Sequence, residues 1–367
     1  MATERYSRHY ALKGFGASGQ QKLQDARVLV VGAGGLGCPA LQFLAAAGVG
    51  SLGIIDHDRI ELSNLQRQLL YDSEDIGLAK ATVAATKLRR LNPEVSIQAY
   101  VEQIHAKNAA QYLQDYDLVL DCTDNFAARY LLCDACKLLD KPLIFGAIYQ
   151  YEGQLAVFNV ADAQGQKTTY RHLFPHPPGP LEAPDCNTAG VLGVLPGIIG
   201  TMQATEAIKL LAGIGTLLSN TLMTINILDN STLTLDIPRA MPLEGNYPSS
   251  LAALKDFDYI SFCGMPNAIQ EISPQQLIQE WRDPDHLLID LRNAEEMPRL
   301  PVDHLPIPLA TLAAQVEKIN RSRVIFICQT GKRSLAAAQF LQQQYPGRYQ
   351  IVHLAGGMDA LQPYLHN

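Results

Sequence analysis

Short apolar runs alternate with helical runs through the first half of the chain. The runs Ala26–Val31 and Ser51–Asp56 are typical of buried strands, and the alanine-rich run Leu36–Ala47 between them is typical of a packed helix. The alternation continues through a helix at Ala79–Leu91, strands at Val95–Tyr100 and Leu118–Asp121, a helix at Phe126–Asp140 and a strand at Pro142–Ala147. This pattern predicts a doubly wound α/β fold, in which helices cover both faces of a parallel sheet.

Antiparallel strands are expected after this alternation, at Glu152–Phe158 and Leu222–Asp229. Between them lies 163–189, a proline-rich stretch with little periodicity. Long loops in compact domains are usually functional, so this stretch is expected to belong to a site.

A second α/β pattern begins near Ile272. Its expected elements are a helix at Pro274–Trp281, strands at Leu287–Asp290 and Arg323–Cys328, a helix at Lys332–Tyr345 and a strand at Ile351–Leu354. The residues before it are rich in Pro, Gly, Ser and Asn, as linkers are. We therefore expect one domain over residues 1–240, a linker over 241–268 and a smaller α/β domain over 269–367.

Composition narrows the classes of protein. The 367 residues are 47% hydrophobic and 18% charged, which argues against intrinsic disorder, and the net charge of −7 argues against non-specific nucleic-acid binding. The N-terminal residues show no signal peptide, and the most apolar run, Gly190–Gly200, is too short to span a membrane and contains Pro196. Seven scattered cysteines are typical of free thiols in a reducing compartment, so we expect a cytoplasmic protein. From its charge and its apolar runs we expect no nucleic-acid and no membrane partner.

A glycine-rich loop follows the first strand. Its glycines, Gly32, Gly34, Gly35 and Gly37, fit the G-x-G-x-x-G pattern and open a helix. Glycines let backbone N–H groups approach a phosphate, and the helix N-terminus favours negative charge. Asp56, at the end of the next strand, is placed to bond a ribose. An NAD-dependent dehydrogenase is the plain interpretation of this loop taken alone.

The charges that follow fit a different ligand. Asp56 and Asp124 come at the carboxyl ends of strands, where open α/β sheets bind ligands, and Arg67 and Lys80 bring positive charge. Two carboxylates, an arginine and a lysine around a glycine loop suit a nucleoside triphosphate with Mg²⁺, whereas hydride transfer needs no such clamp. A surface ion network is the structural alternative for Arg67 and Lys80.

Together these motifs resemble the MoeB/ThiF family, bacterial relatives of ubiquitin-activating enzymes. The resemblance covers about Glu4–Asp236 and rests on the following motifs: Gly32-Ala33-Gly34-Gly35-Leu36-Gly37, Asp56-His57-Asp58, Ser63-Asn64-Leu65-Gln66-Arg67-Gln68, Lys80, Cys122-Thr123-Asp124-Asn125 and Ala204-Thr205-Glu206-Ala207-Ile208-Lys209. It implies a Rossmann-like sheet that binds ATP and Mg²⁺. The family adenylates the C-terminal glycine of a small ubiquitin-like sulfur carrier that ends in Gly-Gly.

The resemblance also assigns roles to single residues. Asp56 takes the ribose, Asp124 holds the metal, and the phosphates are contacted by Asn64, Arg67 and Lys80. The ATP and Mg²⁺ site further includes Asp58, Ser63 and Asn125 beside the four glycines. Arg8 resembles an arginine that the family supplies from the partner subunit, which implies a homodimer. A carboxylate that attacks an α-phosphate brings two anions together, so fixed positive charge is needed there. A solvated terminal charge is the alternative for Arg8.

The cysteines of the first domain are of different kinds. Cys38, Cys122 and Cys136 adjoin strands or helices and are expected to be inert packing residues, and the pair Cys133 and Cys136 lies in a helical run without a second pair.

Family members commonly carry a zinc ion held by two C-x-x-C pairs. At the first pair this chain has Thr169 and His172, and no cysteine falls within 242–247, where the second pair is expected. His172 and His176 are too few ligands to replace the pairs, so we expect no zinc. Cys186 matches the family's crossover-loop cysteine. Its role is left open between a nucleophile, a resolving thiol and a passive residue.

Cys328 opens a loop between a strand and a helix. Its neighbours, Gln329, Thr330, Gly331, Lys332, Arg333 and Ser334, offer successive N–H groups, a helix N-terminus and positive charge, which stabilise an anionic sulfur. The loop resembles the rhodanese active-site loop, C-x-x-G-x-R-S, with flanking motifs at 288–292 and 353–357. Such domains carry sulfane sulfur as a cysteine persulfide. A low-molecular-weight phosphatase is the alternative, although its loop spacing is not met.

These resemblances predict a fused adenylyltransferase and sulfurtransferase of the MoeZ kind. The first domain makes a carrier acyl-adenylate, and a persulfide on Cys328 converts it to a thiocarboxylate, with thiosulfate or a cysteine desulfurase as the sulfur donor. Molybdopterin synthesis is the commonest destination of this architecture, and thiamine synthesis, tRNA thiolation and cysteine synthesis stay open. The rivals are an oxidoreductase, an adenylyltransferase that uses the rhodanese domain for docking, and a non-catalytic scaffold.

Overall fold

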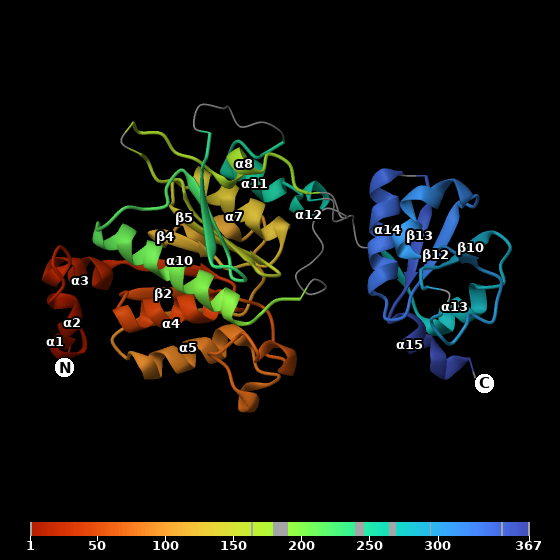
Figure 1. The fold of residues 1–367 in the computed structure, drawn as a ribbon, viewed down its shortest axis with the longest axis horizontal. Coiled ribbons are helices and arrows are strands. Elements are labelled where there is room, and N and C mark those ends of the chain that lie inside the picture. The colour runs from red at the N-terminus through yellow and green to blue at the C-terminus, as the bar shows by residue number, and fades with distance from the viewer. Residues whose placement is uncertain are drawn as a thin grey trace. The chain divides into compact units, whose positions relative to one another are not determined.

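The computed structural model describes residues 2–162, 164–178, 190–238, 246–263, 269–293, 295–345 and 348–365. The described residues divide into two compact units. Those up to His176 and from Gly190 to Tyr259 belong to the first unit, and those from Ile260 onward belong to the second. Each unit is built around its own sheet (Figure 1).

An eight-stranded sheet forms the centre of the first unit, in the order β3-β2-β1-β4-β5-β6-β7-β8. The strands are β1 (Arg27–Val31), β2 (Ser51–Ile55), β3 (Ser96–Tyr100), β4 (Leu118–Asp121), β5 (Leu143–Tyr149), β6 (Glu152–Phe158), β7 (Thr221–Asn226) and β8 (Ser231–Asp236). Pairing is parallel from β3 to β5 and antiparallel from β5 to β8. The order reverses between β1 and β4, and a reversal of this kind is where open α/β sheets bind ligands.

Helical layers enclose this sheet. The longer helices are α3 (Gly16–Asp25), α4 (Gly37–Ala47), α5 (Lys80–Leu91), α7 (Phe126–Leu138) and α10 (Val194–Ala212). The short ones are α1 (Ala2–Arg5), α2 (Ser7–Tyr10), α6 (Ala109–Leu113), α8 (Tyr170–Leu173) and α11 (Leu251–Asp256), and α12 (Tyr259–Phe262) lies at the boundary of the two units. Helix α4 packs against α5 and α10, whereas α6 packs against α7. The central strands are therefore buried on both faces, which explains their uninterrupted apolar runs (Figure 1).

The second unit is a smaller parallel sheet with helices. Its strands lie in the order β11-β10-β12-β13-β9, every pair parallel. They are β9 (Gln270–Ile272), β10 (His286–Asp290), β11 (Leu305–Pro306), β12 (Arg323–Ile327) and β13 (Gln350–Leu354), and the helices are α13 (Pro274–Glu280), α14 (Lys332–Gln344) and α15 (Gly357–Leu361). Separate apolar clusters lie around Phe326 and around Ile325, consecutive residues that face opposite sides of β12.

Several elements differ from the sequence-based expectation. The segment expected as one strand, Leu222–Asp229, is β7 and a turn, because Asn230 has a positive φ of 58° and starts the hairpin to β8. The apolar run Gly190–Gly200 leads into the 19-residue helix α10, whose Pro196 sits in the first turn, where proline is tolerated. Helices α1, α2 and α3 were not expected, and part of the expected linker, residues 250–262, carries α11 and α12.

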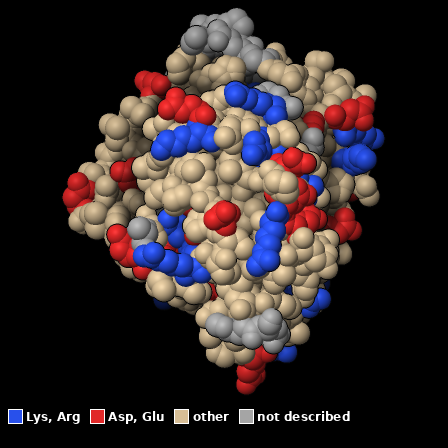
Figure 2. Space-filling view, turned by 90° about the vertical axis from the view of Figure 1, so that its right-hand side faces the viewer, with Lys and Arg blue, Asp and Glu red and all other residues tan. Residues whose placement is uncertain are grey.

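Neither a membrane-spanning helix nor, on the face of Figure 2, a dominance of one charge is seen in the described residues. No helix in the described part of the chain is both long and apolar enough to cross a membrane. On the face shown in Figure 2, basic and acidic side chains are interspersed, so neither sign dominates the described part of that face.

Candidate functional site

The glycine loop lies where β1 passes into α4. Val31 pairs with Ile55 of β2 and with Asp121 of β4, so the residues after all three strands meet at one edge of the sheet. Gly32 has a φ of +95°, and a Cβ there would lie 2.5 Å from the carbonyl oxygen of Cys122. A Cβ on Gly37 would lie 2.0 Å from the carbonyl oxygen of Gly32. The turn therefore requires both glycines, and it leaves the start of α4 facing the edge as an anion cradle.

Asp56 holds this loop from the end of β2. Its Oδ2 accepts the N–H of Ala33 at 2.7 Å, and its Oδ1 accepts the N–H of Asp58 at 2.8 Å. Burial raises the pKa of this carboxyl, while Lys80 and the two backbone donors act in the opposite direction. The Oη of Tyr71 donates to the carbonyl of Ala33 at 2.8 Å, so both polar groups of Ala33 are fixed. Tyr71 was missed by the sequence analysis.

The expected phosphate contacts surround the cradle. A Cβ on Gly35 would lie 3.6 Å from Cγ of Arg67 and 3.0 Å from Pro196, so Arg67 and the first turn of α10 flank the glycines. The Nη1 of Arg67 donates to the carbonyl of Ser63 at 3.0 Å. Asn64 is buried and its Oδ1 accepts the N–H of Glu61 at 3.2 Å, a capping interaction that fixes this segment.

Lys80 and Asp58 form an ion pair at the same edge. Nζ of Lys80 donates to Oδ2 of Asp58 at 2.8 Å, and the lysine side chain is buried whereas the carboxylate is half exposed. Ligand atoms of Asp56, His57 and Asp58 lie within 4.8 Å of one another, close enough to share a cation. The arrangement therefore places fixed positive and negative groups together beside the glycine loop.

The segment after β4 divides into structural and exposed groups. Asp121 is buried, its Oδ1 accepts the N–H of Thr123 at 2.9 Å, and its Oδ2 lies 3.8 Å from Nε of Arg129. Asn125 caps α7, because its Oδ1 accepts the N–H of Ala128 at 2.9 Å. Asp124 is exposed between them. Its carboxylate is free of the capping role and is the better candidate for a metal ligand in this segment.

Arg8 lies away from the cradle of its own chain. The preceding Tyr6 is buried beside the far end of α4, where a Cβ on Gly48 would lie 2.4 Å from its Oη. The Nδ2 of Asn92 donates to the same Oη at 2.8 Å. Arg8 is exposed on α2, two residues further along the chain. The glycine loop and Arg8 therefore lie at opposite ends of α4.

The cysteines of α4, α7 and the β4 edge are buried thiols. Burial raises the pKa of Cys38 and of Cys133 to about 12, and it also raises the pKa of Cys122 and Cys136. These groups are protonated at neutral pH and suit packing, as the sequence analysis expected. Cys186 lies outside the described residues.

Buried polar contacts lie at the segment where the family resemblance placed the first pair of zinc ligands. Thr169 and His172 contact each other, with Oγ1 and Nδ1 3.0 Å apart. Arg171 between them is buried and donates from Nε and Nη2 to the carboxylate of Asp134 on α7, both at 2.7 Å. The hydroxyl of Tyr259 donates to the same carboxylate at 2.7 Å. The carboxylate of Asp134 therefore joins α7 to α8 by an ion pair and to Tyr259 by a hydrogen bond.

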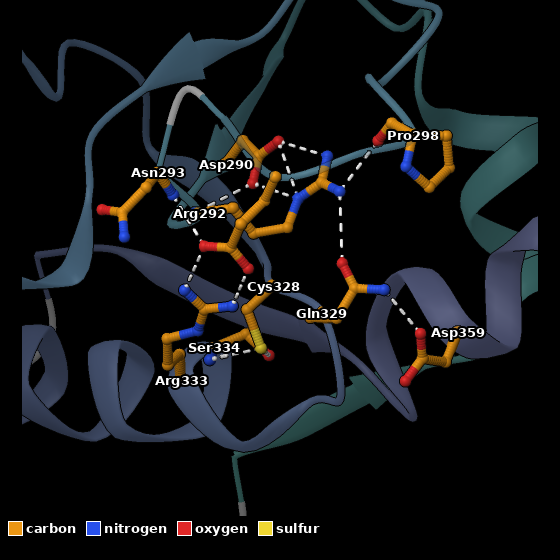
Figure 3. Close-up of polar contacts among 10 residues, drawn as sticks. Asp290, Arg292, Asn293, Pro298, Cys328, Gln329, Arg333, Ser334 and Asp359 are labelled. Atoms are coloured by element: carbon orange, nitrogen blue, oxygen red, sulfur yellow. Dashed lines mark hydrogen bonds and ion pairs between the residues drawn. The ribbon is translucent and has the colours of Figure 1, made fainter.

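In the second unit, Cys328 lies at the start of a tight loop. Its thiol accepts the N–H of Ser334 at 3.3 Å and lies 3.5 Å from the hydroxyl of the same residue (Figure 3). Gly331 has a φ of +86°, which allows the chain to turn into α14. The carbonyl of Cys328 accepts the N–H of Met358 at 2.8 Å, so α15 braces the loop. The sulfur thus has a backbone N–H donor, that of Ser334, at the start of α14.

The two arginines at this loop are paired with carboxylates. Arg333 donates from Nη1 and Nη2 to Glu296, at 2.7 and 2.5 Å, and this contact lowers the pKa of Glu296 to about 2 (Figure 3). Arg292 is buried against Asp290, with Nη2 and Oδ2 2.8 Å apart. A cavity of about 450 Å³ adjoins Arg333 and is lined mainly by apolar side chains, among them Leu309 and Phe340. Glu296 and its pairing were missed by the sequence analysis.

Comparison with known proteins identifies both domains. The ThiF family model matches residues 6–245, and the rhodanese-like domain model matches residues 273–363. A sulfur carrier protein adenylyltransferase of Thermus thermophilus is 47% identical over 71% of this chain and 97% of the relative. The probable adenylyltransferase/sulfurtransferase MoeZ of Mycobacterium tuberculosis is 38% identical over 97% of this chain and 92% of the relative. The solved structure of Escherichia coli MccB has a TM-score of 0.56 at 22% identity, over 66% of this chain and 72% of that one, which shows a shared fold.

The chain belongs to the ThiF family and carries a C-terminal rhodanese-like domain. It is an enzyme that combines adenylyl transfer with sulfur transfer. The glycine loop is therefore that of a ThiF domain rather than of a dehydrogenase, and the Cys328 loop is that of a rhodanese-like domain rather than of a phosphatase.

Proposed function

We propose that this enzyme adenylates the C-terminal glycine of a ubiquitin-like sulfur carrier and then converts the acyl-adenylate to a thiocarboxylate. The observation that carries the proposal is the presence, in one chain, of an anion cradle beside Arg67 and Lys80 and of a thiol cradle at Cys328. The relatives' names support both halves, since one is a sulfur carrier protein adenylyltransferase and another an adenylyltransferase/sulfurtransferase.

Adenylation uses the groups at the edge of the first sheet. ATP phosphates would lie at the glycine loop, where the N-terminus of α4 and Arg67 offset their charge. Oxygen of the carrier carboxylate attacks the α-phosphorus, a P–O bond forms, and the bond to pyrophosphate breaks. Lys80 and an arginine from a second subunit, Arg8, would stabilise the charge that develops. Mg²⁺ fits the exposed carboxylates Asp124 and Asp58, and would neutralise phosphate charge when bound.

Sulfur transfer would start from a persulfide on Cys328. The outer sulfur attacks the acyl carbon, the bond to AMP breaks, and an acyl disulfide joins the carrier to the enzyme. A thiol then attacks Sγ of Cys328, and the carrier leaves as a thiocarboxylate while the two enzyme sulfurs form a disulfide. Cys186 is the proposed resolving thiol. The first source of sulfur would be thiosulfate or a cysteine desulfurase.

The proposal also covers the compartment, the oligomeric state and the pathway of the enzyme. We place the enzyme in the cytoplasm, as a homodimer without bound zinc, and we favour molybdopterin synthesis as the destination of the sulfur. The free thiols that the described residues contain suit a reducing compartment.

The decisive experiment is intact-mass analysis of candidate carriers incubated with enzyme, ATP and thiosulfate, or with a cysteine desulfurase and cysteine. A carrier whose mass rises by the replacement of one oxygen by sulfur identifies the reaction. Cys328→Ser should abolish this product and leave ATP–pyrophosphate exchange intact, because adenylation uses groups of the first unit. If Cys328→Ser still makes thiocarboxylate at the wild-type rate, the rhodanese-like domain is a docking module.

A further inference from the structure

A buried line of polar side chains runs from Cys328 to the surface of the second unit. The hydroxyl of Ser334 lies 3.5 Å from the thiol of Cys328 and 3.4 Å from Nδ1 of His353. On the other side of the imidazole, Nε2 lies 3.4 Å from Oε1 of Glu271. Cys328 is 1% exposed and His353 is 3% exposed, whereas the Glu271 side chain is 65% exposed. The line therefore leads from a buried sulfur to solvent.

The groups along this line fix the state of the histidine. Burial lowers the pKa of His353, although Glu271 acts in the opposite direction, so the imidazole is neutral at pH 7. Nε2 makes no hydrogen bond to Glu271 at 3.4 Å, but the negative charge of that carboxylate favours the neutral tautomer that carries its proton on Nε2. The lone pair on Nδ1 then faces Ser334. The hydroxyl of Ser334 donates to the carbonyl of Gly331 at 2.9 Å, so it must rotate toward Nδ1 before it can pass the ring a proton.

The chemistry at Cys328 needs such a group. A thiolate, not a thiol, attacks the donor sulfur, and a thiol that is 1% exposed cannot give its proton directly to bulk water. The N–H of Ser334 donates to the sulfur and so stabilises negative charge there, but it does not take the proton. Among the described side chains, Ser334 lies within hydrogen-bonding distance of the thiol and connects it to a base.

We propose that His353, acting through Ser334, takes the proton of the Cys328 thiol when the persulfide forms, and that Glu271 orients the imidazole. This inference rests on the proposed function of Cys328 as the sulfur carrier. His353 does not touch the reacting sulfur, so its role is that of a positioning and proton-holding residue.

With thiosulfate as the sulfur donor, Cys328 and Ser334 each pass on one proton. The S–H bond of Cys328 breaks and sulfur keeps the electron pair. The thiol proton moves to Ser334 as the hydroxyl proton of Ser334 moves to Nδ1 of His353. The thiolate attacks the outer sulfur of thiosulfate, a new S–S bond forms, and sulfite leaves with the electron pair of the broken S–S bond. The imidazolium then returns its extra proton to solvent by way of Glu271.

Apart from Lys332, which is exposed, the other charged groups around the thiol are paired. They are Arg333 with Glu296, Arg292 with Asp290, and Asp359 with the amide of Gln329. Arg333 interacts electrostatically with Cys328 and favours the thiolate without accepting a proton. His353 is therefore the base that the geometry offers, while the arginine contributes a constant field.

The test is the pH dependence of Cys328 alkylation by iodoacetamide, followed on the Cys328 peptide in the full-length enzyme. His353→Gln should slow the reaction at pH 7 at least about tenfold, because the imidazole no longer takes the thiol proton as the new bond forms. The rate at high pH, where the thiolate forms without a base, should stay unchanged, so the rise of the profile moves to higher pH. Ser334→Ala should give the same shift with His353 intact, and the double variant should shift no further. His286→Gln, on β10 and paired with Asp283, is the matched control and should keep the wild-type profile.

Different results would overturn the role of His353 and the proposed function of Cys328. Wild-type profiles in both His353→Gln and Ser334→Ala overturn the inference, provided that the wild-type enzyme loads sulfur on Cys328. If His353→Gln fails to fold, judged by circular dichroism, Ser334→Ala decides alone. If wild-type Cys328 takes up no sulfur from thiosulfate or from a desulfurase, the proposed function itself fails.

Discussion

At the scale of the residue, replacing a buried lysine and replacing a more exposed one on the same helix should affect ATP–pyrophosphate exchange differently. Lys80 is buried at the start of α5 and pairs with Asp58 beside the cradle, whereas Lys87 is more exposed and pairs with Asp72 and Asp75. Lys80→Ala should lower the rate of ATP–pyrophosphate exchange about 10²- to 10³-fold, as loss of a preorganised donor does elsewhere. Lys87→Ala is the control and should keep the wild-type rate. Equal rates for the two variants would remove Lys80 from the site.

The ion pair of Glu296 with Arg333 should make the free energy of unfolding depend on pH. The pKa of Glu296 is lowered from 4.5 to about 2, so the pair stabilises the fold fully above pH 4.5 and loses this effect as the pH falls toward 2. Both side chains are partly exposed, so Glu296→Gln should lower the free energy of unfolding by at most about 1 kcal/mol at pH 7. Denaturant unfolding at a series of pH values should show the variant and the wild type converging between pH 4.5 and 2. A constant difference across that range would contradict the assignment.

At the scale of the element, a buried ion pair joins α7 to α8. Arg171 is fully buried and Asp134 nearly so. Asp134→Ala should lower the free energy of unfolding by about 3–5 kcal/mol, because it leaves a buried cation without its partner. Lys167→Ala removes an exposed ion pair with Asp140 in the same region and should lower it by about 1 kcal/mol or less. Denaturant unfolding of the two variants measures the difference, and equal losses would show that this pair does not hold the segment.

The same contacts bear on the absence of zinc predicted from the sequence. Thr169 and His172 bond to each other, and Nη1 of Arg171 between them donates to the carbonyl of Asn246 at 3.3 Å, in the stretch where the second pair of zinc ligands was expected. Elemental analysis should therefore find no stoichiometric zinc, and EDTA should leave the unfolding midpoint unchanged. One tightly held zinc per chain would overturn this prediction.

What the sequence could and could not predict follows from the range of each interaction. The strands, the glycine loop and the Cys328 loop depend on local apolar runs and on glycines at fixed spacing, so pattern alone found them. The contact of Glu296 with Arg333 and that of Ser334 with His353 join residues on different elements and depend on packing, which a single sequence does not show. The β7–β8 hairpin had a readable signal, since Asn230 takes the positive φ that such turns favour. Helix α10 was obscured by its glycines and by Pro196.

At the scale of the whole molecule, the position of Arg8 argues for a shared site. The 11 residues of α4 separate Arg8 from the glycine loop of its own chain by about 16 Å, at 1.5 Å per residue. That distance is longer than an arginine side chain, and buried Tyr6 anchors the segment at the far end. An arginine needed at the α-phosphate would therefore come from a second copy of the chain.

Mixed dimers test this arrangement directly. Arg8→Ala and Asp124→Ala should each abolish most ATP–pyrophosphate exchange as homodimers. When the two variants are mixed and heterodimers are confirmed by native mass spectrometry, exchange should return. The reason is that the Arg8→Ala chain contributes an intact cradle with its own Asp124, and the Asp124→Ala chain contributes Arg8, so that each heterodimer holds one complete site. If Arg8 served its own chain, both sites of the heterodimer would keep a defect, and the mixture would stay as inactive as its components.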